Sequence, residues 1–468
     1  MKKIPIAVAI VMAFALCTRK PDPALSSLVS GTVDPAMEEA LTINYAGFLD
    51  SAAIDREGAF SIPVQLDKAG YGMIFFNDRL MDIYLEPGKN LELVINSSTF
   101  PDKIEFGGEL GPVNRYLQLS RKLDKQSDIG SDRLYSMSTL DFAKFTDSIK
   151  ILKEKLLNEF VERFQGIDKE FADNRRTDIL YTWANQQLLY TGYYLILKNE
   201  LPELPGDYHE RYLAKINLND SSLLESPMYS TFLENYLDYR EAVYLEYHPE
   251  VEKLWFPLSV ARFRVINEEF TDPSVKNQVL FNAMNDHLDN FGSDHLDSFI
   301  TNFNVHCTNE EFRSRIEEKI KRQDEIARGQ EATDMKFFDP EGNKVLLSDL
   351  YGSLLYVNFW ASWSHPSIQE FPHWEALRKR FEGMDIRFVS VSMDFGKDRN
   401  KWKYIINKQD LGGTQLLYNQ GSSVASEVYF INDLPRYFLI DSNGKIISTH
   451  APYPSEDVEP VLMNLLEK

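Results

Sequence analysis

The stretch from Leu354 to Pro372 restricts the fold of this chain more than any other. Its first part, LLYVNFW, is apolar almost throughout, as expected for a strand buried on both faces of a sheet. A Trp-rich turn follows, and then a helix that Pro366 opens. Because such a strand needs covering elements on both sides, this stretch predicts an α/β domain.

The rest of residues 329–468 continues this alternation. Helices are expected over 367–381, 399–408, 423–429 and 455–466, and strands over 386–394, 414–419, 436–441 and 445–450. The last two strands flank a Ser-Asn-Gly turn and form a hairpin. Strands that alternate with helices and end in a hairpin predict a mixed central sheet.

Two other regions precede this domain. Residues 27–110 contain short alternating strands separated by turns rich in glycine, which predicts an antiparallel β-sandwich. Residues 111–328 have apolar side chains three and four positions apart, which predicts an all-α domain. We interpret the aromatic stripe within residues 179–197 as core or interdomain packing rather than a ligand platform. The predicted fold is thus multidomain α+β.

The N-terminus has the pattern of an export signal. Two lysines precede an apolar run from Ile4 to Leu16, too short to span a bilayer, and Cys17 follows. The pattern resembles a bacterial lipoprotein signal, which predicts a signal peptide over residues 1–17, lipidation at Cys17 and a polar tether over residues 18–26. Plain secretion and an uncleaved anchor are the alternatives. Arg19 and Lys20 favour a protein anchored in the cell envelope and facing the periplasm.

The charge of the chain excludes one class of partner. With 71 acidic and 50 basic residues the formal charge is −21, and no block of Lys and Arg interrupts the acidic excess. Binding to nucleic acid needs a basic footprint, so a nucleic-acid partner is not expected.

The C-terminal domain resembles the TlpA/ResA-like, AhpC/TSA-type branch of the thioredoxin superfamily, in the form found in Bacteroidetes exported lipoproteins. The matching motifs occur in the family's order: FxDPEGxxVxLSDLxG, VNFWASW, ExPHWEAL, VSVSMD and LPRYFLIDSNGKII. The resemblance implies a thioredoxin-like fold and a cis-proline at Leu434-Pro435. It also places Ser364 and Ser367 where the family has its two redox cysteines.

Serine cannot perform the chemistry of those cysteines. The family's first cysteine attacks a disulfide as a thiolate and the second resolves the mixed disulfide. A serine hydroxyl stays protonated at neutral pH and forms no disulfide, and residues 329–468 contain no cysteine. We therefore expect no thiol–disulfide turnover and no catalytic residue at Ser364 or Ser367.

A binding function remains. The resemblance implies a partner-binding groove formed by Trp363, Ser364, His365, Pro366, Ser367, Leu434, Pro435 and Arg436. Extended peptide would pair there with backbone groups near Leu434. Arg436, where the family has a small hydroxyl residue, would place a positive charge beside the groove and alter the choice of partner.

Two broad functions compete. The first is a redox-inactive, lipid-anchored scaffold that binds an exported or envelope polypeptide and the membrane. The second is an active thiol–disulfide oxidoreductase in cell redox homeostasis, as the family name implies. A third interpretation assigns the function to the β-sandwich and helical domains, which would bind glycan or peptide. A nucleophilic Ser364 with His365 as its base is disfavoured, because adjacent side chains at a helix start diverge and no orienting acid follows.

No cofactor or metal is expected. Asp-His-Leu-Asp occurs at residues 286–289 and again at 294–297, but an eight-residue offset does not stack the two sets on one helix face. Ser364 is instead expected to cap the helix, and His365 and His373 to lie at the surface. Cys307, the second of two cysteines, is interpreted as a partly buried side chain.

Overall fold

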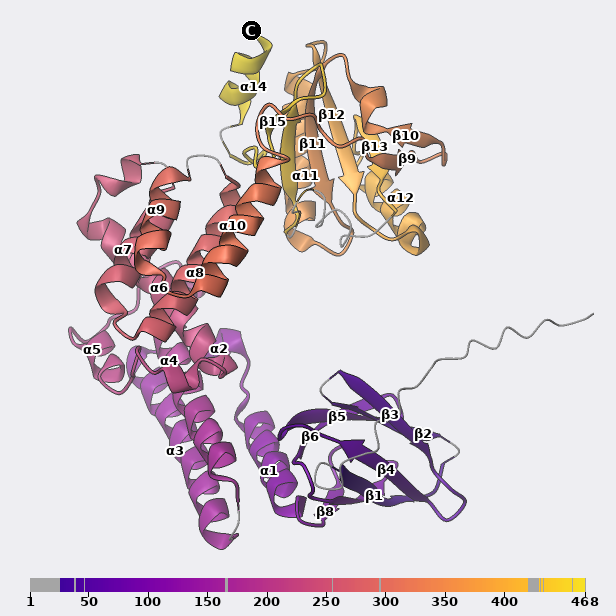
Figure 1. Cartoon of the computed structure of the whole chain (residues 1–468), viewed down its shortest axis with the longest axis vertical. Coiled ribbons are helices and arrows are strands. Elements are labelled where there is room, and N and C mark those ends of the chain that lie inside the picture. The colour runs from indigo at the N-terminus through magenta and orange to yellow at the C-terminus, as the bar shows by residue number, and fades with distance from the viewer. Residues whose placement is uncertain are drawn as a thin grey trace, which may run out of the picture. The chain divides into compact units, whose positions relative to one another are not determined.

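A computed structural model of the chain describes residues 26–37, 39–45, 47–164, 167–254, 256–293, 296–419, 429, 431, 433–456 and 458–467. The predicted signal peptide, Cys17 and nearly all of the tether lie outside these ranges. The chain divides into two compact units, residues 1–215 and 216–468. The division falls inside the predicted helical region, so that its first helices are grouped with the strands and its later helices with the C-terminal domain. Figure 1 shows the strands and helices of each unit.

The first unit begins with eight strands. They are β1 (Ser26–Asp34), β2 (Ala40–Tyr45), β3 (Phe48–Ala53), β4 (Ala59–Gln65), β5 (Gly70–Phe76), β6 (Arg79–Leu85), β7 (Leu91–Asn96) and β8 (Ile104–Gly107). They form two four-stranded sheets, β4-β1-β7-β8 and β3-β2-β5-β6. Residues alternate between buried and exposed along β4 and β7, and the buried side chains of both sheets form one core.

One pairing departs from the antiparallel prediction. Strand β1 runs parallel to β7, with Val29 opposite Leu91, whereas the other pairs in these two sheets are antiparallel. The first sheet is therefore mixed. The physical reason is that β1 and β7 are joined through five intervening strands, so no tight hairpin turn forces them to run in opposite directions.

Five helices complete the first unit: α1 (Gly111–Ser127), α2 (Ser131–Tyr135), α3 (Thr139–Arg163), α4 (Lys169–Lys198) and α5 (Tyr208–Leu213). Ser138 caps α3 by accepting a hydrogen bond from the Asp141 amide, and Asp168 caps α4 in the same way. Helix α4 ends at Asn199 in the left-handed conformation, just before two prolines that cannot continue a helix.

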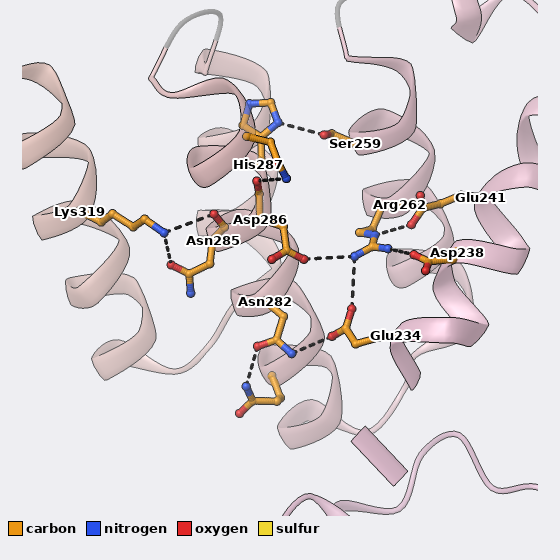
Figure 2. A network of polar contacts seen from close by, with 12 residues as sticks. Glu234, Asp238, Glu241, Ser259, Arg262, Asn282, Asn285, Asp286, His287 and Lys319 are labelled. Carbon is orange, nitrogen blue, oxygen red and sulfur yellow. Dashed lines mark hydrogen bonds and ion pairs between the residues drawn. The ribbon is translucent and has the colours of Figure 1, made fainter. Parts of the chain in front are cut away.

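The second unit begins with helices that enclose a charged network. They are α6 (Pro227–Tyr247), α7 (Pro257–Glu269), α8 (Pro273–Phe291), α9 (Asp297–His306) and α10 (Glu310–Asp324), with the short 3-10 turns η2 (Ser221–Leu223) and η3 (Val251–Lys253). Figure 2 shows the guanidinium of Arg262 on α7 among four carboxylates. These belong to Glu234, Asp238 and Glu241 on α6 and Asp286 on α8.

The first Asp-His-Leu-Asp segment lies at the end of α8 and makes separate contacts. The imidazole Nδ1 of His287 lies 3.0 Å from the hydroxyl of Ser259, and the carboxylate of Asp289 pairs with Lys319 at 2.9 Å. Asp294 and His295 of the second segment lie outside the described residues. Within the described ranges, no three acidic, histidine or cysteine side chains are grouped so as to hold a metal ion.

The C-terminal part of this unit is a seven-stranded mixed sheet with helices. Its strands are β9 (Lys336–Phe338), β10 (Lys344–Leu346), β11 (Leu354–Trp360), β12 (Ile386–Ser392), β13 (Thr414–Leu417), β14 (Arg436–Ile440) and β15 (Ile446–Ser448). Its helices are η4 (Leu347–Leu350), α11 (His365–Arg380), η5 (Gly396–Asp398), α12 (Arg399–Lys408) and α14 (Glu459–Leu466). The strand order is β10-β9-β13-β12-β11-β14-β15. The helix expected over 423–429 lies almost wholly outside the described residues.

Strand β11 is central and buried along its whole length, as its composition predicts. It pairs in parallel with β12 and antiparallel with β14, which confirms a mixed sheet. Leu355, Val357 and Phe359 pack into the core on one face. On the other face Tyr356 packs with residues of α11 and α14, and Trp360 with residues of α11 and α12. The apolar run thus positions the turn that follows it.

Candidate functional site

The turn between β11 and α11 carries the two serines. Ser364 is the N-cap of α11, as predicted, and its hydroxyl oxygen accepts a hydrogen bond from the Ser367 amide at 3.4 Å. Pro366 lies in the first turn of the helix, where its missing N–H costs no helical hydrogen bond. Ser364 is 5% exposed and Ser367 is fully buried, so neither hydroxyl is freely presented to solvent.

The serine hydroxyls form a directed chain of hydrogen bonds. The Ser367 hydroxyl donates to Ser364 Oγ at 2.8 Å, and the Ser364 hydroxyl donates to the carbonyl oxygen of Leu434 at 3.0 Å. Each hydroxyl thus has a partner for its proton. The peptide bond between Leu434 and Pro435 is cis, as the family resemblance implied. The turn and the cis-proline segment are therefore joined by side-chain and backbone atoms.

Three of the predicted groove residues face solvent. Trp363 is 63% exposed, and His365 and Pro366 are also exposed. Leu434 is half-buried and Pro435 buried. We call the exposed residues Trp363, His365 and Pro366, together with Leu434, the Trp363 surface. His373, near the middle of α11, is exposed as expected.

Arg436 is buried, and its charge has a partner within the chain. Its side chain is 7% exposed, and its guanidinium donates a hydrogen bond to the carbonyl oxygen of Asp289 at 2.8 Å. Asp289 lies in the last turn of α8, where carbonyl oxygens have no partner within the helix. A cation at a helix C-terminus is also electrostatically favourable. The guanidinium of Arg436 is thus directed to α8.

His450 strengthens the same contact. Its Nε2 lies 3.0 Å from the Asp289 carbonyl oxygen, and Nδ1 lies 3.0 Å from the Thr449 hydroxyl. Burial, together with the neighbouring charge of Arg436, lowers the pKa of His450 to about 3. The neutral imidazole therefore carries its proton on Nε2, because only that arrangement donates to the carbonyl. Arg436 and His450 together hold the sheet against the end of α8.

A buried carboxylate beneath the turn was missed by the sequence analysis. Asp394, just beyond β12, is 1% exposed and accepts hydrogen bonds from the amide and the hydroxyl of Ser362 at 3.0 and 2.9 Å. It also accepts from the hydroxyl of Ser392 at 2.8 Å. The available signal was the position of these polar residues at the carboxyl ends of two neighbouring parallel strands. Asp394 fixes the backbone of the turn from below.

No thiol in this domain can replace the family's two cysteines. Residues 328–468 contain no cysteine. Cys307 ends α9, is 1% exposed, and its pKa is raised by burial, so its thiol is neither accessible nor poised to ionise. Cys17 lies outside the described residues. Residues 328–468 therefore hold no thiol that could form or reduce a disulfide.

Among the helices within the described ranges, none combines the length and the apolar content that crossing a bilayer requires.

Residues 328–449 match the AhpC/TSA family model. The chain is 28% identical over 119 residues to the thiol-disulfide oxidoreductase ResA of a Bacillus cereus strain, a match that covers 25% of this chain and 66% of that protein. It is 25% identical over 142 residues to ResA of Bacillus subtilis (strain 168), covering 30% of this chain and 77% of that protein. The chain thus spans about two thirds to three quarters of the length of these relatives.

Solved structures align to a similar fraction of the chain. A putative thiol-disulfide oxidoreductase from Bacteroides vulgatus is 33% identical, with 30% of this chain and 98% of that chain covered and a TM-score of 0.28. A putative thiol:disulfide interchange protein DsbE from Chlorobium tepidum is 27% identical, with 30% and 97% covered and a TM-score of 0.27.

Proposed function

We propose that this chain, which carries a C-terminal thioredoxin-like domain similar to ResA and DsbE, uses that domain to bind a polypeptide without redox turnover. One observation carries the proposal. In a domain without cysteine, Ser367 and Ser364 form a hydrogen-bonded chain that ends on the Leu434 carbonyl. The hydroxyls stabilise the turn and the cis-proline segment, whereas a redox pair would have to break and form a sulfur–sulfur bond.

The Trp363 surface supports binding. A tryptophan that is 63% exposed presents a large apolar area at low conformational cost, and such side chains dominate binding energies in protein interfaces. The turn that carries it is held from below by Asp394 and capped by Ser364. A preorganised apolar anchor binds with less loss of entropy than a flexible one.

The N-terminal pattern supports a proposal for the location. We propose that the chain is exported, lipidated at Cys17 and held in the cell envelope, so that its partner is an exported or envelope polypeptide. A Cys17→Ser variant tests this step. The wild-type chain is expected to incorporate radiolabelled palmitate and the variant to lose it, and palmitate on both or on neither contradicts the lipid anchor.

The competing function is that of the relatives, a thiol–disulfide oxidoreductase. Sequence similarity to ResA favours it, and the absence of cysteine from residues 328–468 opposes it. Electrons from a dithiol need a disulfide acceptor, and a pair of hydroxyls provides none.

Photocrosslinking tests the binding function directly. A benzoylphenylalanine at position 363 is expected to crosslink an exported polypeptide in intact cells. The same residue at Lys379, exposed near the far end of α11, serves as the control. Recovery of the same species from both positions, or from neither, would overturn the assignment of the Trp363 surface.

A further inference from the structure

A pocket of about 560 Å³ lies among α3, α4 and α5 of the first unit. It is lined by residues of α3, α4 and α5 and of the loop before α5. We call it the α4 pocket, and its lining includes Leu140, Ala143, Asp147, Trp183, Gln187, Tyr190, Tyr194, Glu203, Tyr208, Arg211, Tyr212 and Lys215. The aromatic stripe interpreted as core packing therefore also borders an open space.

The polar atoms on the floor of the pocket already have partners within the chain. The Tyr190 hydroxyl donates to the Met137 carbonyl at 2.7 Å. The Tyr208 hydroxyl donates to Gln187 Oε1 at 3.1 Å, and Gln187 Nε2 donates to the Thr146 hydroxyl at 2.8 Å. The hydroxyl protons of the floor are thus engaged within the chain, and the rings that carry them are largely buried, with Tyr190 0% and Tyr208 7% exposed.

The indole of Trp183 is engaged in the same way. Its Nε1 donates to the Asp147 carboxylate at 2.8 Å, and the ammonium of Lys215 lies 4.9 Å from the ring centroid. Trp183 is 5% exposed. Both the donor and the ring of Trp183 are therefore engaged within the chain.

The rim carries charges of both signs in equal number. Asp147 and Glu203 face Arg211 and Lys215 around the opening, and these four residues are exposed. Leu140, also on the rim, is 62% exposed. Equal numbers of opposite charges favour neither an anion nor a cation.

We propose that the α4 pocket receives an apolar side chain, aromatic or branched, from an uncharged segment of a partner polypeptide. An apolar floor surrounded by a charged rim is the usual anatomy of a protein-interface pocket that holds an anchor residue. A saccharide is less well matched to the floor, because the hydroxyl protons of Tyr190 and Tyr208 are already engaged within the chain. The backbone amides that flank an anchor side chain can instead pair with the carboxylates and cations of the rim.

This site is independent of the Trp363 surface. It belongs to the first unit, whereas the Trp363 surface belongs to the second. If binding at the α4 pocket is disproved, the proposal for the Trp363 surface still stands, and the reverse also holds.

Calorimetry with two capped probe peptides tests the proposal on the chain without its signal peptide. One peptide has tryptophan at the centre of a Gly-Ser context, and the other has serine there. The tryptophan peptide is expected to bind at least tenfold more tightly, because only its central side chain can bury an apolar ring in the pocket. Equal affinity for the two peptides would overturn the proposal.

Two variants locate the binding. Ala143→Phe fills the pocket and Leu140→Glu places a charge at its exposed mouth, and each is expected to reduce affinity for the tryptophan peptide at least tenfold. Lys144→Gln, exposed on the same helix, is the control and should bind as the wild type does. Because Leu140 is exposed, its variant remains informative if Ala143→Phe does not fold.

Two further results would reassign the pocket. Displacement of the tryptophan peptide by maltotriose at equal concentration would show that the pocket takes a hydroxylated ligand. A concentration-dependent dimer that light scattering detects in the wild type but not in Leu140→Glu would show that a second copy of the chain occupies the pocket. Either result contradicts a polypeptide partner of different sequence.

Discussion

The hydroxyl of Ser364 donates a hydrogen bond to the carbonyl oxygen of Leu434, 3.0 Å away, across seventy positions of sequence. The same oxygen atom of Ser364 accepts hydrogen bonds from the hydroxyl and the amide of Ser367. One side chain thus caps a helix, receives a second hydroxyl and fixes the residue before the cis-proline. These contacts give Ser364 a structural role that needs no change of oxidation state.

Ser364→Ala is expected to destabilise the C-terminal domain by about 1–3 kcal/mol, because it removes a helix cap and leaves buried polar groups without a partner. Ser367→Ala is the matched control, since it retains both the cap and the bond to Leu434, and it should cost about 1 kcal/mol or less. The stability of both variants is measured by urea unfolding, with hydrogen exchange of the α11 amides as the probe. Equal losses in the two variants would contradict the role given to Ser364.

Arg436→Thr is expected to leave crosslinking at position 363 unchanged, because the guanidinium is directed to α8. It should instead increase hydrogen exchange at the end of α8 and in β14, where a charged hydrogen bond of about 1.5–3 kcal/mol is lost. Arg436→Lys, which retains the charge, should recover part of the protection. An altered set of crosslinked partners with normal exchange at α8 would support the sequence-based prediction for this residue.

The second unit is expected to become less stable as pH rises. The cause is the titration of Glu241, which belongs to the charged network around Arg262 (Figure 2). Burial raises the pKa of Glu241 from 4.5 to about 7, although Arg262 opposes the shift. The folded chain therefore binds the proton of the Glu241 carboxyl more tightly than the unfolded chain does. Ionising this carboxyl lowers the free energy of unfolding, and the loss is absent below pH 4.5 and complete above pH 7. The loss amounts to about 3 kcal/mol.

Glu241→Gln removes this titration and isolates its effect. Urea unfolding at about pH 5 and about pH 8 gives the free energy of unfolding of both proteins. The value for the variant minus that for the wild type should be larger at pH 8 than at pH 5. Glu246→Gln, on the exposed side of the same helix, provides the comparison and should follow the wild type. A stability difference between Glu241→Gln and the wild type that does not vary with pH would contradict the assignment.

The parts of the fold that were predictable are those that local sequence specifies. Strand β11 was recognisable because both of its faces are apolar, and α11 because Ser364 and Pro366 stand at its start. The parallel pairing of β1 with β7 was not, since alternation gives the buried face of a strand but not the direction of its neighbour.

The candidate site was predictable only in part for the same reason. The turn and the cis-proline follow from a continuous motif, whereas the partner of Arg436 lies 147 positions earlier in the chain. Asp394 was overlooked because a carboxylate after a strand usually faces solvent, and only the fold brings Ser362 against it. The α4 pocket escaped notice because helical periodicity does not distinguish a packed aromatic stripe from one that borders a cavity.

The central claim is that the C-terminal domain has lost sulfur chemistry and kept a binding surface. The most direct test is insulin-disulfide reduction with dithiothreitol as the electron source, comparing the wild type with the Ser364→Cys/Ser367→Cys double variant. The wild type is expected to match the control without protein, and the double variant to exceed it. Reduction of insulin by the wild type above that control would contradict the account and make Cys307 the first residue to replace.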